Sequence, residues 1–109
     1  MKNRRVVVTG IGSLTPIGNN SQDYWKALQD GVSGAGPITH FNTENFKTQF
    51  ACEVKGFQVT DFIHRKEARK MDLFCQYAMV ATDEAIIDSA LNLDKINLDR
   101  AGIIWGSGI

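Results

Sequence analysis

Four side chains in this sequence could supply nucleophilic or metal chemistry: Cys52, Cys75, His40 and His64. A thiolate and an imidazole are the usual parts of a cysteine nucleophile with its base, and both groups bind zinc. The four residues are far apart and form no Cys-x-x-Cys pair, so neither a local metal site nor a disulfide framework is indicated. Cys75 falls on the apolar stripe of a predicted helix and Cys52 in an alternating segment, so both thiols are predicted to pack as small apolar side chains. We expect no metal ligand and no catalytic residue among the four.

The only dense cluster of charge lies at residues 65–70, with the sequence RKEARK. Helical spacing would put Lys66 and Lys70 one turn apart with Arg69 beside them, so that several cations could face a phosphate or an acidic surface. The alternative is a solvated start of a helix. Cations near a helix N-terminus oppose its dipole by roughly 0.3 to 1 kcal/mol each, which favours a binding role over a purely structural one.

Gly10 and Gly12 follow an apolar run, as the first glycines of a dinucleotide-binding loop do. That fingerprint requires a third glycine or an alanine three positions later, and here the position holds Thr15. Pro16 then removes an amide from the would-be anion site. A nucleotide-binding module is therefore a minor alternative.

Two apolar runs, residues 6–8 and 102–109, are predicted to be central strands that position these groups. Both runs are continuous rather than alternating, which is typical of strands covered on both faces. We expect them to be neighbours in one mainly parallel sheet. Gly106 and Gly108 follow the carboxyl end of the second strand, where ligands meet open α/β sheets, although close packing of the chain explains these glycines equally well.

The residues between the two runs are predicted to cover the sheet. Helical caps and periodicity predict elements in the following order: a helix from about Ser21 to Gly31, a loop over 31–48, an edge strand over 49–55, a short helical turn at 60–63, and a long helix over 71–91. The buried stripe of the long helix consists mainly of small side chains, which predicts close approach by another element. Helical crossovers between buried strands predict an α/β layered domain.

The composition excludes several classes of protein. Twelve basic residues balance twelve acidic ones, so the overall charge does not indicate nucleic acid or an anionic membrane as a partner. The hydrophobic fraction of 43% is ordinary for a globular domain. The N-terminal apolar run is too short for a signal peptide, and no stretch of about 20 apolar residues occurs, so we expect a cytoplasmic protein.

The second apolar run has no later helix or strand to cover it, and two central strands need more neighbours than these residues offer. We therefore expect residues 1–109 to be the first, incomplete part of a longer domain.

Four stretches together resemble the β-ketoacyl-acyl carrier protein synthases, most closely the type II elongating enzymes. The stretches are RRVVVTGIG at 4–12, TPIG at 15–18, RKEARKMD at 65–72 and GSGI at 106–109. The resemblance extends over the whole chain and covers about the first quarter of such an enzyme.

The resemblance implies a thiolase-like fold with layers α/β/α/β/α, in a homodimer. It implies transfer of an acyl chain from acyl carrier protein to an active-site cysteine, followed by decarboxylating condensation with malonyl-acyl carrier protein. Two histidines stabilise the developing charge, and no cofactor is used. This would make the whole protein an acyltransferase of fatty-acid synthesis.

The resemblance also assigns residues. Lys66, Arg69 and Lys70 match the family's basic patch for acyl carrier protein, and Gly108 and Ile109 match the wall of its acyl-chain pocket. The cysteines and histidines of this sequence do not stand in the family's catalytic motifs, so these 109 residues are expected to be inactive alone. A non-catalytic partner subunit of the chain-length-factor type remains the alternative.

Overall fold

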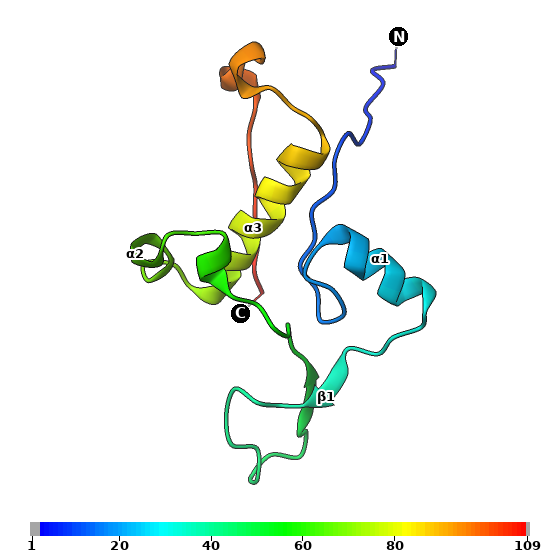
Figure 1. Cartoon of the computed structure of the whole chain (residues 1–109), viewed down its shortest axis with the longest axis vertical. Coiled ribbons are helices and arrows are strands. Elements are labelled where there is room, and N and C mark those ends of the chain that lie inside the picture. Colours follow the sequence, from blue (N-terminus) through cyan, green and yellow to red (C-terminus); the bar gives the residue numbers. More distant parts are fainter. Residues whose placement is uncertain (1–2, 109) are drawn as a thin grey trace.

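The computed structural model describes residues 3–108, which form three helices and a two-stranded sheet (Figure 1). The elements are α1 (Ser21–Gln29), β1 (Ala35–Pro37), β2 (Phe50–Cys52), α2 (Arg65–Ala68) and α3 (Leu73–Asp88). Single 3-10 turns occur at Val59–Asp61, Leu93–Lys95 and Leu98–Arg100.

Helix α1 confirms the element predicted from about Ser21. The side chain of Asn20 accepts a hydrogen bond from the amide of Asp23 at 2.8 Å, which satisfies one free N–H of the first turn. Gly31 follows the helix with φ +66°, the left-handed conformation that a glycine adopts without steric cost.

Strands β1 and β2 form an antiparallel pair in which Gly36 lies opposite Ala51. β2 confirms a strand within 49–55, but the prediction of a loop over 31–48 was wrong at β1. Glycine and proline in this segment were interpreted as turn residues. An edge strand nevertheless tolerates Pro37, which has no backbone N–H, because not every residue of an edge strand has to donate a hydrogen bond to a neighbouring strand. Cys52 is exposed at the end of β2, so the prediction that it packs in a core was also wrong.

Helix α3 confirms the long helix, with shorter bounds than 71–91. It buries Val80 and Ala81. The predicted close approach occurs where Gly10 and Gly12 cross it. A β-carbon built on Gly12 would lie 1.8 Å from the carbonyl oxygen of Ala81, so the chain passes directly over the helix backbone.

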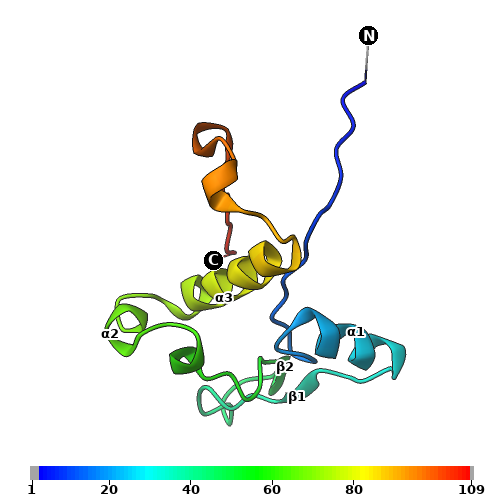
Figure 2. The same ribbon diagram turned by 45° about the horizontal axis from the view of Figure 1, so that its top comes forward.

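The two apolar runs are not strands within the described residues, and this prediction was wrong. The first run extends away from the carboxyl end of α3 towards the N-terminus, and the described part of the second run passes beside α3 (Figures 1 and 2). The pairing of β1 with β2 is the one sheet that residues 3–108 contain. Val6 is 90% exposed and Ile104 is 99% exposed. Extended backbone forms a ladder only where a second strand lies beside it, and within the described residues no such partner lies beside either run.

The buried core is correspondingly small and consists of Ala27, Ala68, Val80 and Ala81 among the described residues. The radius of gyration is 17.4 Å, against roughly 13 Å for a compact domain of this length. Layers of helix and sheet are not formed by residues 3–108. Among the helices of this range, none combines the length and the apolar character that a membrane crossing requires.

Candidate functional site

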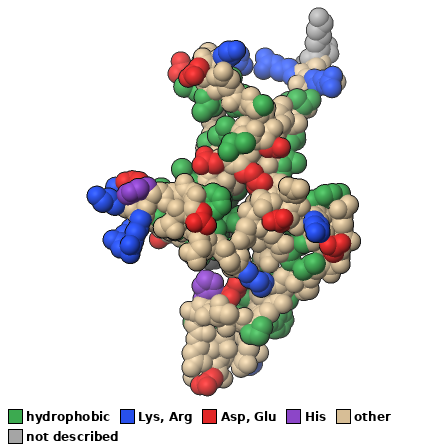
Figure 3. All heavy atoms as spheres, in the orientation of Figure 1, with side chains coloured by type: hydrophobic (Ala, Val, Ile, Leu, Met, Phe, Trp, Pro, Cys, Tyr) green, Lys and Arg blue, Asp and Glu red, His purple; other side chains and the backbone are tan. Residues whose placement is uncertain are grey.

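The first candidate site is the basic surface formed by Arg65, Lys66, Arg69 and Lys70. All four side chains are exposed, and Figure 3 shows blue side chains projecting from the region of α2. His64 precedes the helix, and its Nδ1 accepts a hydrogen bond from the amide of Lys66 at 3.3 Å. The imidazole therefore caps α2.

The basic surface spans a whole short helix, from its first residue to just beyond its end, and not the start of the long one. The amide of Arg69 donates to the carbonyl of Arg65 at 3.2 Å, α2 ends at Ala68, and α3 begins only after Asp72. Arg69 and the next residue thus lie at the carboxyl end of α2, where cations are favoured. The argument that a helix dipole disfavours these cations was therefore wrong for Arg69 and Lys70, whereas Arg65 and Lys66 do lie in the first turn of α2. The predicted binding role depends on the charge and exposure of all four.

One member of the basic surface is partly neutralised. Lys70 Nζ lies 2.9 Å from Glu67 Oε1, and both side chains are exposed, so the pair contributes about 0–1 kcal/mol to stability. Within residues 3–108, Arg65, Lys66 and Arg69 form no ion pair. Their charges are therefore available to an acidic partner.

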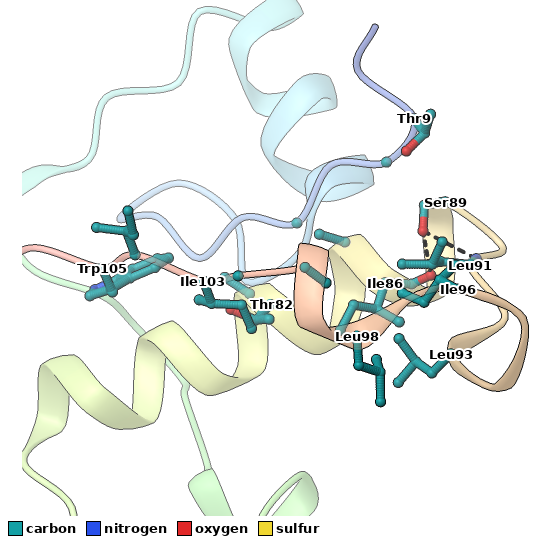
Figure 4. Close-up of a pocket in the computed structure, with 17 residues that line it drawn as sticks. Thr9, Thr82, Ile86, Ser89, Leu91, Leu93, Ile96, Leu98, Ile103 and Trp105 are labelled. Carbon is teal, nitrogen blue, oxygen red and sulfur yellow. Dashed lines mark hydrogen bonds between the residues drawn. The ribbon is translucent and has the colours of Figure 1, made fainter. Parts of the chain in front are cut away.

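The second candidate is an open apolar hollow of about 800 Å³ beside α3 (Figure 4). Its walls come from residues 9–12, from α3 and from residues 91–105, the last including Ile103 and Trp105. The lining holds threonine and serine hydroxyls but no charged side chain among the described residues, so it suits an apolar occupant and offers no acid or base.

Of the two predicted acyl-pocket residues, Gly108 is not among the residues that line this hollow. A β-carbon on Gly108 would have no atom within 4 Å, and Ile109 lies outside the described residues. Their role stays a prediction.

The cysteines and histidines are not brought together as a catalytic or metal site. Cys75 is half-buried on α3, and Cys52 is exposed. His40 Nε2 lies 3.7 Å from Glu53 Oε1, while His64 caps α2. No group of three possible metal ligands occurs in the described part of the chain.

The carboxylate of Glu53, which follows β2, is hydrogen-bonded to Thr39, which lies just beyond β1. The Thr39 hydroxyl donates to the carboxylate at 2.8 Å, which lowers the pKa of Glu53, and the backbone amide of Thr39 and the charge of His40 act in the same direction. Burial raises the pKa of Tyr77, and the negative charge of Glu53 adds to this. These shifts follow from packing and hydrogen bonding, and no nucleophile lies among these groups.

Backbone amides of the loop with Gly10 and Gly12 already donate hydrogen bonds to carboxylates of α3. Asp88 Oδ2 accepts from the amide of Ile11 at 2.9 Å, and Glu84 Oε2 accepts from the amide of Ser13 at 2.8 Å. A phosphate would need these same amides and would be repelled by both acids. The geometry argues against the nucleotide-binding alternative.

The sequence interpretation missed Glu84 and Asp88. The available signal was their spacing: they lie one helical turn apart, next to the small residues Ala81 and Ala85, which predicts that they border the surface crossed by another segment.

Comparison with known proteins identifies the family. The family model described as "Beta-ketoacyl synthase, N-terminal domain" matches residues 3–109. The chain is 50% identical over 109 residues to a Vibrio cholerae protein named 3-oxoacyl-[acyl-carrier-protein] synthase 2, covering 100% of this chain and 26% of that protein. A Synechocystis protein of the same name is 47% identical with the same coverage.

A solved structure is also similar. It is named "The ishigamide ketosynthase/chain length factor" and matches with a TM-score of 0.77 and 41% sequence identity, over 85% of this chain and 23% of that one. The chain thus spans about a quarter of the length of the Vibrio and Synechocystis relatives. With the match of residues 3–109 to the model of the N-terminal domain, these findings show that the chain belongs to the β-ketoacyl synthase family.

Proposed function

We propose that this chain forms part of a 3-oxoacyl-[acyl carrier protein] synthase of fatty-acid elongation. The observation that carries the proposal is identity of 47–50% along the entire chain to proteins named for this activity. In the reaction, malonyl-acyl carrier protein loses CO₂ and its α-carbon attacks an acyl-cysteine thioester. A carbon–carbon bond forms, the cysteine thiolate leaves, and a 3-oxoacyl-acyl carrier protein is released.

The described residues would contribute structure and binding surface to this enzyme, and no chemical step. The complete enzyme would have the thiolase-like layered α/β/α/β/α fold. The match to a ketosynthase/chain length factor structure with a TM-score of 0.77 supports this fold. A homodimer in the cytoplasm is the assembly that we expect.

The proposal is tested on the protein expressed from its complete reading frame, purified and supplied with acyl- and malonyl-acyl carrier proteins. Release of ¹⁴CO₂ from carboxyl-labelled malonyl groups, together with a product two carbons longer, is the expected result. A folded protein that gives neither product on its own would overturn the proposal, and products formed only after a separate synthase subunit is added would favour the partner subunit described next.

A non-catalytic partner subunit is the second candidate. The observation that favours it is the likeness to a structure named for a chain length factor as well as a ketosynthase. The residue at the nucleophile position of the complete protein distinguishes the two, because the partner subunit lacks the cysteine.

The basic surface is proposed to dock acyl carrier protein, an acidic protein. Three observations support this: its cations are exposed, Lys66 and Arg69 have no ion pair in residues 3–108, and Arg69 and Lys70 project from adjacent positions. Exposed opposite charges raise the association rate more than the lifetime of a complex, so docking should weaken with salt.

Charge reversal tests the docking role. The triple substitution Lys66→Glu, Arg69→Glu and Lys70→Glu is expected to lower affinity for acyl carrier protein at least tenfold and to abolish its salt dependence. The matched control reverses three exposed cations elsewhere, Lys47, Lys95 and Arg100, and changes the net charge equally. Equal losses in both variants would show a general charge effect and no docking site.

A further inference from the structure

The segment that leads into α1, together with the start of α1, is joined to α3 by very few polar contacts. Within the described residues, no backbone–backbone hydrogen bond connects residues 10–29 with α3. The connecting hydrogen bonds are three, each from a backbone amide to a carboxylate of α3. Two of the three end on the same side chain, Glu84.

Glu84 divides its two oxygens between two segments. Its Oε2 accepts from the amide of Ser13 at 2.8 Å, and its Oε1 accepts from the amide of Ser21 at 2.7 Å. Ser21 is the first residue of α1, so its N–H is one of the amides that a helix leaves without an internal partner. The positive end of the α1 dipole further favours a carboxylate at this position.

Apart from Glu84, the one side chain of α3 that accepts a hydrogen bond from this segment among the described residues is Asp88, which accepts from the amide of Ile11 only. Gly12 lies flat on α3, where a β-carbon would meet the carbonyl oxygen of Ala81, and the helix presents only small side chains there. Small side chains bury little apolar area, so hydrophobic contact contributes modestly. Hydrogen bonds to a charged carboxylate are stronger than those between neutral groups and are therefore the larger contribution.

We propose that Glu84 is a positioning residue whose two carboxylate oxygens hold the Ser13 loop and the first turn of α1 together on α3. The role needs two acceptor oxygens and a negative charge. Glutamine offers one acceptor oxygen and an NH₂ group, which cannot accept from the second amide. A substitution that keeps the shape of the side chain therefore separates this role from simple filling of space.

Hydrogen exchange of the protein expressed from its complete reading frame tests the proposal, with mass spectrometry resolving the amides of Ser13 and Ser21. Glu84→Gln is expected to speed exchange at one or both of these amides at least tenfold, and Glu84→Ala at both. Asp83→Asn is the matched control, since Asp83 is the exposed neighbour on α3 and forms none of these bonds. The β1–β2 pair should keep its protection in all three variants.

Two results would overturn the proposal. One is exchange at Ser13 and Ser21 that stays at the original rate in both Glu84 variants. The other is equal acceleration at these amides and in the β1–β2 pair, because a general loss of stability would then replace the local role. Should Glu84→Ala fail to fold, the glutamine variant alone decides between these outcomes.

Discussion

Replacing Gly12 with alanine would place a methyl group against the backbone of α3. The new carbon would lie 1.8 Å from the carbonyl oxygen of Ala81 and 2.8 Å from the amide nitrogen of Ala85. Real contacts of this kind are essentially never under 3.0 Å. Because both neighbours are helix backbone, which cannot rotate aside, the loop itself must move by more than an ångström.

The cost of this movement has two parts. Overpacking of a close contact costs about 1–3 kcal/mol when the surroundings relax. The same displacement would stretch the 2.8 Å bond from Ser13 to Glu84, and loss of a hydrogen bond to a charged group costs about 1.5–3 kcal/mol. We therefore expect Gly12→Ala to lower the free energy of unfolding by about 3–5 kcal/mol, a large share of the 5–15 kcal/mol typical of native proteins.

Urea denaturation of the protein expressed from its complete reading frame measures this loss. Gly36→Ala is the matched control, since a β-carbon on Gly36 has no atom within 4 Å and its φ is not left-handed. If Gly12→Ala falls within about 1 kcal/mol of the control, the loop does not lie against α3 as described, and the packing argument fails.

Three further substitutions test contacts elsewhere. Asn20→Ala frees an amide of the first turn of α1 and should cost about 1 kcal/mol in urea unfolding, with no change expected for a substitution to serine, which also caps. The Thr39 hydroxyl holds the pKa of Glu53 below its ordinary value of 4.5, so Glu53 stabilises the fold above that pH and the contribution is lost as the pH falls through the lowered value. Glu53→Gln should therefore flatten the acid side of a stability profile measured by thermal melting from neutral pH to about pH 3. An unchanged profile would contradict this. Lys55 Nζ donates to the carbonyl of Gly34 at 2.8 Å and to two other carbonyls, so Lys55→Met should cost about 1–2 kcal/mol and Lys55→Arg less; equal losses would argue against the hydrogen bonds as the cause.

The elements that could be predicted are those whose signals are local. Asn20 and Ser21 start α1 through side-chain capping, and Gly31 ends it through a positive φ, all within one short stretch. The stripe of small residues on α3 likewise predicts close approach, and the approach of Gly12 confirms it. The partner segment, far away in the sequence, could not be named from the pattern.

Strand β1 was missed because its cause is not local. Gly36 pairs with Ala51, and nothing near Gly36 in the sequence reveals this partner. The opposite error occurred at residues 6–8 and 103–105. Their continuous apolar pattern indicates that both faces could be buried, but burial depends on neighbours that residues 3–108 do not supply.

The basic surface was predicted from charge alone, and the helix boundary within it was missed. Asp72 lies immediately before α3 and is a residue type common at N-caps, which was the available signal for a break after Lys70. Moving the boundary reverses the electrostatic argument for Arg69 and Lys70, because these two cations now lie at a carboxyl end, where structure alone can favour them. The docking role therefore needs the matched charge reversal to separate it from helix stabilisation.

The glycine loop shows why a short motif cannot be judged without the elements packed on it. Gly10 and Gly12 could expose amides to a phosphate, and their spacing does not say whether another acceptor reaches those amides first. Here Asp88 and Glu84 reach them, and they can do so because glycine lets the loop lie on the backbone of α3. In a dinucleotide-binding fold, glycines without a β-carbon let a phosphate approach the loop. In this protein, the same glycines let the loop approach two carboxylates of α3. Alanine at position 12 would therefore weaken the carboxylate contacts without creating a phosphate site, since the acids would remain beside the displaced loop.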